Sequence, residues 1–220
     1  MSAVSEWIVK EYFETLGYMV SQPCKYSPSG RRKRLEEEVD LIVVNPLITE
    51  LRIPDSILWT TADLQGIPRA VVGVYGGHTE RFYPSMLNHI PAMLRFASEE
   101  SVRLVSRRLG TAPLAKILCF PQLPASEKLR ADTLKLLKQK GVDGVLLFRT
   151  LLLELVSGVD TNKNYEKSDI LQMLRILKNY DLIKHPQMEL FGGHKRRRRK
   201  DKTLSTEPAS PPAASGNQHK

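Results

Sequence analysis

Cysteine is scarce in this sequence, which holds two in 220 residues, Cys24 and Cys119, separated by 95 positions. Two distant cysteines cannot build a disulfide scaffold, and no histidines cluster near either one as they would in a zinc site. Both lie in apolar runs, where a thiol usually behaves as a small hydrophobic side chain. The cysteine pattern therefore excludes a disulfide-rich or zinc-stabilised small domain.

Long apolar runs are also missing. No stretch approaches the roughly 18 apolar residues that a membrane helix needs. The first residues do not combine a basic segment with a following apolar one, which is the pattern of a signal peptide. We therefore expect a soluble protein in the reducing cytoplasm, with no membrane partner.

The common phosphate and nucleophile motifs do not occur either. The sequence contains no G-x-x-x-x-G-K-[ST] loop, no G-x-G-x-x-G turn and no G-x-S-x-G elbow. The pairs Gly76-Gly77 and Gly192-Gly193 are too short to replace them. A small-molecule enzyme of these types has little support.

Positive charge is abundant but unevenly distributed. Of the formal charge of +9, residues 195–220 supply +6, with eight Lys or Arg against Asp201 and Glu207. Residues 1–194 therefore carry only +3, and overall basicity indicates nucleic-acid binding for the tail alone.

Composition divides the chain into two parts. Apolar residues are spread evenly through the first 190 residues, which predicts one α/β domain at 1–190 that ends in two helices. After Phe191, a basic cluster leads into Ser, Pro, Ala and Gln, which cannot build a core. We expect residues 191–220 to form a disordered tail.

Hydrophobic periodicity predicts alternating helices and strands through residue 180. Helices are expected at 3–16, at 84–109 with a kink at Pro91 or a break near Ser98, at 126–140, at 150–156 and at 168–180. Strands are expected at 18–24, 38–44, 69–75, 116–120 and 145–148. Segment 46–68 reads as an insertion with one short helix near 55–63. Because early strands are adjacent and later strands alternate with helices, we expect an α/β fold with a mixed central sheet, helices on both faces, and C-terminal helices.

An acid interrupts the second predicted strand. Residues 39–44 are aliphatic except for Asp40, and Asn45-Pro46 then ends the strand. Burying a carboxylate is unfavourable unless something pairs with it. A divalent metal, a Lys or Arg, or backbone N–H groups could each do so, and only the metal implies catalysis. An Asp at the strand end, in solvent or in a structural ion pair, is the alternative.

The element order α-β-β-β-α-β-α-β, with Glu6 in the first helix and Asp40 inside the second strand, resembles the restriction-endonuclease-like superfamily, also called PD-(D/E)XK nucleases. The stretch Glu38-Val39-Asp40-Leu41-Ile42-Val43 is similar to the second core strand of archaeal Holliday-junction resolvases and Mrr-type endonucleases. This resemblance covers residues 3–150. It implies that the strand Asp and a carboxylate of an E-x-K or Q-x-K motif on the next strand hold Mg²⁺, while the Lys positions or activates the attacking water.

Four side chains are candidates for catalysis: Asp40, Glu6, Glu38 and His78. The resemblance implies that Asp40 is a metal ligand and Glu6 an auxiliary acid. Glu38 alternates with Asp40 and would share its strand face, and His78 could be a general base or phosphate contact. Each has a structural alternative: Glu6 in the helix dipole paired with Lys10, Glu38 as a solvated charge, and His78 as an ordinary turn residue.

The third predicted strand departs from the family pattern. Positions 73 and 75, where E-x-K would fall, hold Gly73 and Tyr75, which can neither ligate Mg²⁺ nor carry a positive charge. His78, Glu80 or Arg81 at the strand end could replace the missing groups. The sequence therefore leaves catalysis open.

Two basic clusters could contact a phosphate backbone. The first comprises Arg31, Arg32, Lys33 and Arg34, which the nearby acids Glu36 to Glu38 would neutralise. The second comprises Lys195, Arg196, Arg197, Arg198, Arg199 and Lys200. Unneutralised cations on a flexible segment release counterions on meeting nucleic acid, although such contacts carry no sequence specificity, and the segment could equally aid solubility.

Two hypotheses follow. In the first, the protein is a divergent Mg²⁺-dependent phosphodiesterase that acts on nucleic acid, with DNA expected ahead of RNA. In the second, the nuclease-like fold persists without catalysis, as a module that binds nucleic acid or a protein partner, including a second copy of itself.

Overall fold

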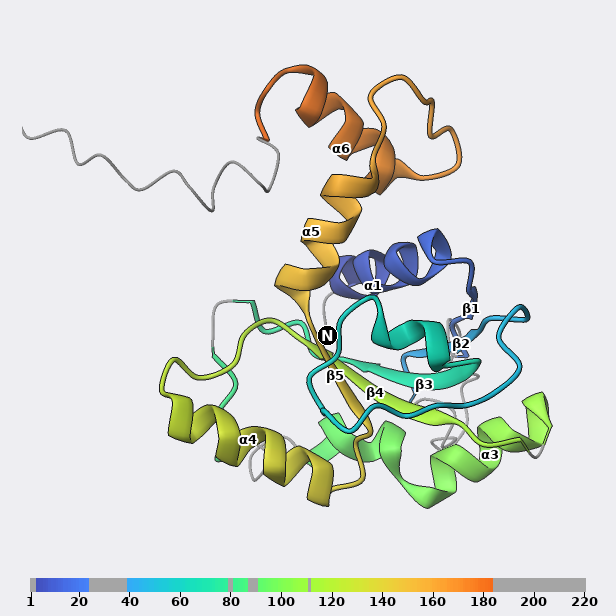
Figure 1. Ribbon diagram of the computed structural model, residues 1–220, viewed down its shortest axis with the longest axis vertical. Helices are drawn as coiled ribbons and strands as arrows, with labels where there is room; N and C mark the ends of the chain where they lie inside the picture. Colours follow the sequence, from blue (N-terminus) through green and yellow to red (C-terminus); the bar gives the residue numbers. More distant parts are fainter. Residues whose placement is uncertain (1–2, 24–38, 79–80, 87–90, 111, 184–220) are drawn as a thin grey trace, which may run out of the picture.

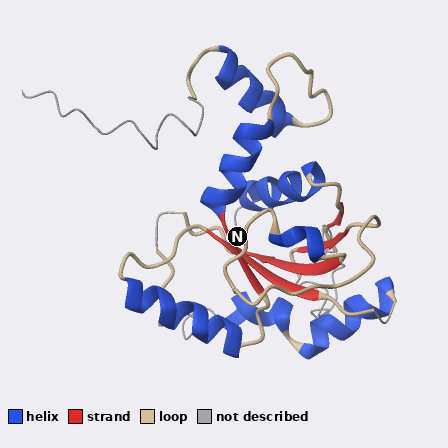
Figure 2. Ribbon diagram, viewed as in Figure 1, coloured by secondary structure: helices blue, strands red, loops and turns tan. Residues whose placement is uncertain are grey.

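In the computed structural model, one five-stranded sheet lies between two layers of helices (Figures 1 and 2). The strands are ordered β1-β2-β3-β4-β5, which is also their order along the chain. They span Met19–Ser21, Leu41–Val44, Arg69–Val74, Ala115–Phe120 and Gly144–Leu147. The structure describes residues 3–23, 39–78, 81–86, 91–110 and 112–183.

The sheet is mixed, as the sequence predicts. Strand β2 pairs antiparallel with both β1 and β3, whereas β4 pairs parallel with both β3 and β5. The early strands follow one another without an intervening described α-helix, and each later pair is joined by a helical crossover. The expected α/β class with helices on both faces is confirmed.

Two apolar cores separate the sheet from its helices. On one face, Leu41, Val43 and Val72 pack with residues of α1, α5 and α6. On the other face, Ile42, Val71 and Leu118 pack with η3, α3 and α4. Figure 1 shows α5 and α6 rising away from the sheet beyond α1. The α-helices span Ala3–Thr15 (α1), Glu99–Leu109 (α3), Glu127–Gln139 (α4), Phe148–Gly158 (α5) and Asp169–Asn179 (α6), and the 3₁₀ helices Asp63–Gly66 (η2) and Pro91–Ala97 (η3).

Local capping explains where several helices begin and end. Gly17 and Gly110 follow α1 and α3 with positive φ angles of 84° and 89°, which glycine adopts easily. Ser98 and Ser168 cap α3 and α6, each accepting a backbone N–H with its hydroxyl. The predicted break near Ser98 is therefore confirmed, with 3₁₀ helix η3 before it. No helix in the described ranges is long and apolar enough to cross a membrane.

The insertion at 46–68 contains one short helix, as predicted, but this helix is η2 at Asp63–Gly66, and most of the range 55–63 is not helical. Instead the chain runs along the outer edge of β5, where Trp59 donates its backbone N–H to Val145 (2.9 Å) and Val145 donates to Ile57 (2.7 Å). The Trp59 ring is buried against Gly144, where an added Cβ would lie 2.2 Å from it. This pairing with β5 satisfies backbone N–H and C=O groups of the segment without a local helix. It also covers the edge of the sheet.

Candidate functional site

Asp40 lies at a bend immediately before β2, not inside the strand as the sequence predicts. Its Oδ2 atom accepts the backbone N–H of Val74, at the end of β3, over 2.7 Å. One of the three partners considered for this acid, a backbone N–H group, is therefore present. The bend explains the error, since it frees the carboxylate from the strict alternation of the strand.

The environment of Asp40 favours its neutral form. Burial raises the pKa of Asp40 to about 6, the hydrogen bond from Val74 lowers it in part, and the negative charge of Glu6 raises it. Burial, assisted by the charge of Asp40, also raises the pKa of the Cys119 thiol on β4. Asp40 therefore lies between α1 and the middle strands of the sheet.

Glu6 lies in the first turn of α1, where the helix dipole favours a carboxylate. It does not pair with Lys10, which instead contacts Glu14 over 3.6 Å. Its Oε2 atom accepts a long hydrogen bond of 3.4 Å from the amide of Gln22. The predicted pairing of Glu6 with Lys10 is therefore wrong. Because the charge of Glu6 raises the pKa of Asp40, these two predicted site acids lie near each other.

His78 follows β3 and completes this group. Its Nε2 atom lies 2.9 Å from the hydroxyl of Ser5, the residue before Glu6, and its ring meets the ring of Phe148 edge to face at 4.6 Å. The side chain of His78 is exposed. The structure therefore gathers Glu6, Asp40 and His78 at one end of the sheet, although they are far apart in the sequence.

The structure does not test the other predicted site residues. Arg81 is described and exposed. The remaining candidates lie outside the described residues: Glu38, Glu80, Arg31, Arg32, Lys33, Arg34, Lys195, Arg196, Arg197, Arg198, Arg199 and Lys200. Their assignments stay predictions from the sequence.

Strand β3 has a structural reason for lacking the family's acid. A Cβ atom added to Gly73 would lie 2.4 Å from the ring of Phe96, a buried residue of η3. Any side chain at position 73 would therefore displace that ring. Tyr75 packs edge to face with Phe82, with ring centroids 6.3 Å apart. Aromatic packing thus fills the side of β3 that carries positions 73 and 75, which is the side opposite α1.

The residues present match only part of the magnesium site that the resemblance implies. Mg²⁺ prefers oxygen ligands, and Asp40 and Glu6 supply two carboxylates. The strand carboxylate and the lysine are missing from β3, and the described ranges hold no group of three or more metal-binding side chains. We derive no metal-dependent step from this arrangement.

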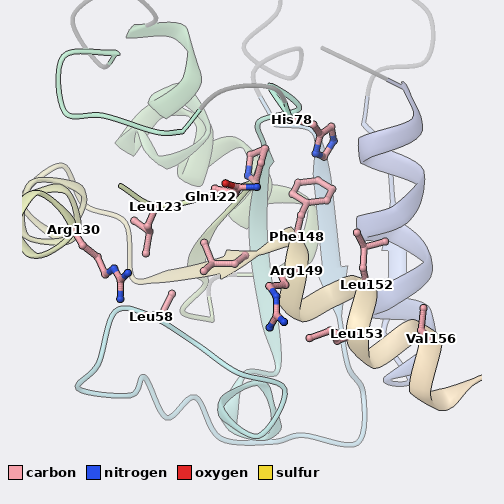
Figure 3. Close-up of a pocket in the computed structure, with 12 residues that line it drawn as sticks. Leu58, His78, Gln122, Leu123, Arg130, Phe148, Arg149, Leu152, Leu153 and Val156 are labelled. Atoms are coloured by element: carbon pink, nitrogen blue, oxygen red, sulfur yellow. The ribbon is translucent and has the colours of Figure 1, made fainter. Parts of the chain in front are cut away.

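A pocket at the carboxyl ends of β3, β4 and β5 was not predicted from the sequence. It encloses about 840 Å³ next to His78 (Figure 3). Two arginines line it: Arg130 from α4 and Arg149 from the first turn of α5. The other lining residues are Leu58, His78, Pro121, Gln122, Leu123, Leu147, Phe148, Leu152, Leu153 and Val156.

The rule that α/β proteins bind ligands beyond the carboxyl ends of parallel strands could have located this pocket. Applied to the predicted strands, it singles out the residues that follow each one, among them His78, Gln122 and Arg149. The apolar wall from α5 carries no comparable sequence signal, because its leucines read as ordinary core positions.

Comparison with known proteins adds no assignment. No protein-family model, no curated protein and no solved structure matches this chain.

Proposed function

We propose that this protein is a nucleic-acid-associated domain with a restriction-endonuclease-like core that binds nucleic acid without cleaving it. The element order supports this proposal: α1 precedes three antiparallel strands, and a helical crossover then leads to β4 parallel with β3. The basic cluster at 195–200 supplies positive charge suited to a phosphate backbone.

The observation that carries the non-catalytic part of the proposal is the aliphatic lining of β3 on the side of Asp40, where Val72 and Val74 belong to the core that packs with α1. In the family pattern, a carboxylate and a lysine on this strand face the acid of the neighbouring strand. Here the β3 residues on that side are buried and aliphatic, and Gly73 faces Phe96 on the opposite side of the sheet. This absence of a carboxylate and a lysine from β3 supports binding without cleavage.

Asp40 has a structural role that does not require a metal. A second acid, Asp143, stands before β5 and accepts the backbone N–H of Lys116 over 2.8 Å. Asp40 makes the equivalent bond from the start of β2 to Val74. Both carboxylates join the beginning of one strand to a neighbouring strand, so an Asp in this setting serves the sheet.

Binding is tested by measuring retention of labelled single-stranded and double-stranded DNA and RNA by the full chain, in EDTA, at salt concentrations from about 50 to 200 mM. The proposal predicts retention that weakens steeply with salt. Retention that does not change with salt, or its absence at the lowest salt with every substrate, would reject the proposal.

The second candidate function is a divergent metal-dependent phosphodiesterase. It is favoured by the proximity of Glu6 to Asp40, since the charge of Glu6 raises the pKa of Asp40. Incubation of DNA and RNA with Mg²⁺ or Mn²⁺ tests it. Cleavage that disappears in Asp40→Asn would establish this candidate in place of the first, and cleavage that survives the substitution would reject Asp40 as its site.

A further inference from the structure

We propose that the pocket between Arg130 and Arg149 binds one unpaired nucleotide, with its phosphate between the guanidinium groups and its base against the apolar wall. This inference rests on the proposed function, because it identifies where the folded domain contacts nucleic acid. It places that contact away from Asp40, which does not line the pocket.

The two arginines make the pocket selective for anions. Figure 3 shows them on opposite sides, with Leu58 and Leu123 between them. Both side chains are exposed, and neither forms an ion pair with an acid in the part of the chain that the structure describes. Among the described residues, no Asp or Glu lines the pocket. Two guanidinium groups without a described acidic partner favour an anionic ligand, and guanidinium groups can bind phosphate in a bidentate manner.

The rest of the pocket lining suits a ligand that is larger and less polar than a phosphate. Leu152, Leu153 and Val156 of α5 form one side, and the volume of about 840 Å³ exceeds what a lone inorganic anion fills. Small-molecule sites typically enclose about 300–1,000 Å³ and are mostly apolar with a few polar groups. A ligand that combines an anion with an apolar ring system therefore fits this lining.

Two further lining residues fit the planar, hydrogen-bonding character of a base. His78 is exposed at the mouth and is held by Ser5 and by the edge of the Phe148 ring. Imidazole rings are among the platforms on which unpaired bases stack. Gln122, also exposed, carries an amide that can donate to and accept from a base edge.

The test is equilibrium binding of deoxyadenosine 5′-monophosphate to the full chain, compared with deoxyadenosine and with inorganic phosphate. We expect the nucleotide to bind at least about tenfold more tightly than either fragment, because each fragment loses one set of contacts. Arg130→Ala and Arg149→Ala should each weaken nucleotide binding by about tenfold or more. Arg103→Ala, which removes an exposed arginine on α3 paired with Glu99, should leave it unchanged.

A second arm separates this inference from the proposed function. We expect the nucleotide to compete with a single-stranded oligonucleotide for the full chain, and both arginine variants to weaken that complex. If the oligonucleotide binds but the nucleotide does not compete and the variants bind as wild type does, the pocket assignment is wrong and the proposed function stands. If the nucleotide binds but no oligonucleotide does, the pocket serves free nucleotides and the proposed function is wrong.

Discussion

The carboxylate of Asp40 joins two strands by accepting the backbone N–H of Val74 over 2.7 Å. Burial and the nearby charge of Glu6 oppose ionisation of the same group. Asp40, the acid that most suggests a metal site, therefore also joins two strands of the sheet. Its ionisation at neutral pH costs free energy of folding.

Asp40 should make stability depend on pH. Its pKa is about 6 in the folded protein against an ordinary value of 3.8 for an aspartate, so the folded state binds the proton more tightly. The stability that this adds is fully present below about 3.8 and is lost as the pH rises through about 6. Asp40→Asn keeps an oxygen acceptor for Val74 but has no charge to bury. Its stability relative to wild type should rise by on the order of 2–3 kcal/mol between about pH 3.5 and 7.5.

Urea unfolding of both proteins across this pH range measures the effect. Asp132→Asn provides the control, because Asp132 is exposed on α4 and its substitution should give a nearly flat difference. A difference for Asp40→Asn that is equally flat would contradict the environment described for this acid.

Gly73→Ala should destabilise the protein, because the added Cβ would lie 2.4 Å from the Phe96 ring. Overpacking of this kind costs about 1–3 kcal/mol. Phe96→Leu in the same chain should relieve part of that cost. A double-mutant cycle on the free energy of unfolding tests this relation. Strictly additive effects would show that the Phe96 ring does not restrict the space for a side chain at position 73.

Trp59→Ala should cost about 3–5 kcal/mol, because the ring is buried at the sheet edge. The backbone N–H of Val145, which donates to Ile57, should exchange with solvent faster in this variant. Trp7 offers a matched control, since its side chain is 54% exposed on α1 and its substitution should change stability little. Similar losses for the two variants would contradict the edge-covering role of Trp59.

Neutralising the six cations at 195–200 by Ser should reduce the dependence of nucleic-acid affinity on salt. If all six contact phosphates, the slope of log K against log salt should fall in magnitude by about 4–5. A variant that exchanges Lys and Arg within the cluster keeps the charge and should keep the slope. An unchanged slope after neutralisation would remove the cluster from the interface.

Local features made much of the fold predictable. The helical period of α6, the Ser168 cap and the glycines after α1 and α3 act within a few residues of the elements that they define. Strand pairing also followed, because chain connectivity favours hairpins between adjacent strands and crossovers between separated ones.

Long-range packing set the limit of prediction. Trp59 pairs with Val145, and Phe96 fills the space beside Gly73. The residues near them in the sequence predict neither contact. The pocket beside His78 arises in the same way, since Arg130 and Arg149 come from different helices. The aliphatic run around Asp40, the family resemblance and the position of His78 after a strand predict the three candidates, but neither the bend before β2 nor the Val74 partner follows from the sequence.

The most direct test of the proposed function follows one labelled single-stranded DNA through binding and integrity together. The wild-type chain is mixed with the DNA in EDTA and in Mg²⁺, and the bound fraction and the DNA length are measured in the same samples over time. Binding in both conditions, with the DNA at full length throughout, is the predicted result. Shortening of the DNA that requires Mg²⁺ and is lost in Asp40→Asn would contradict it.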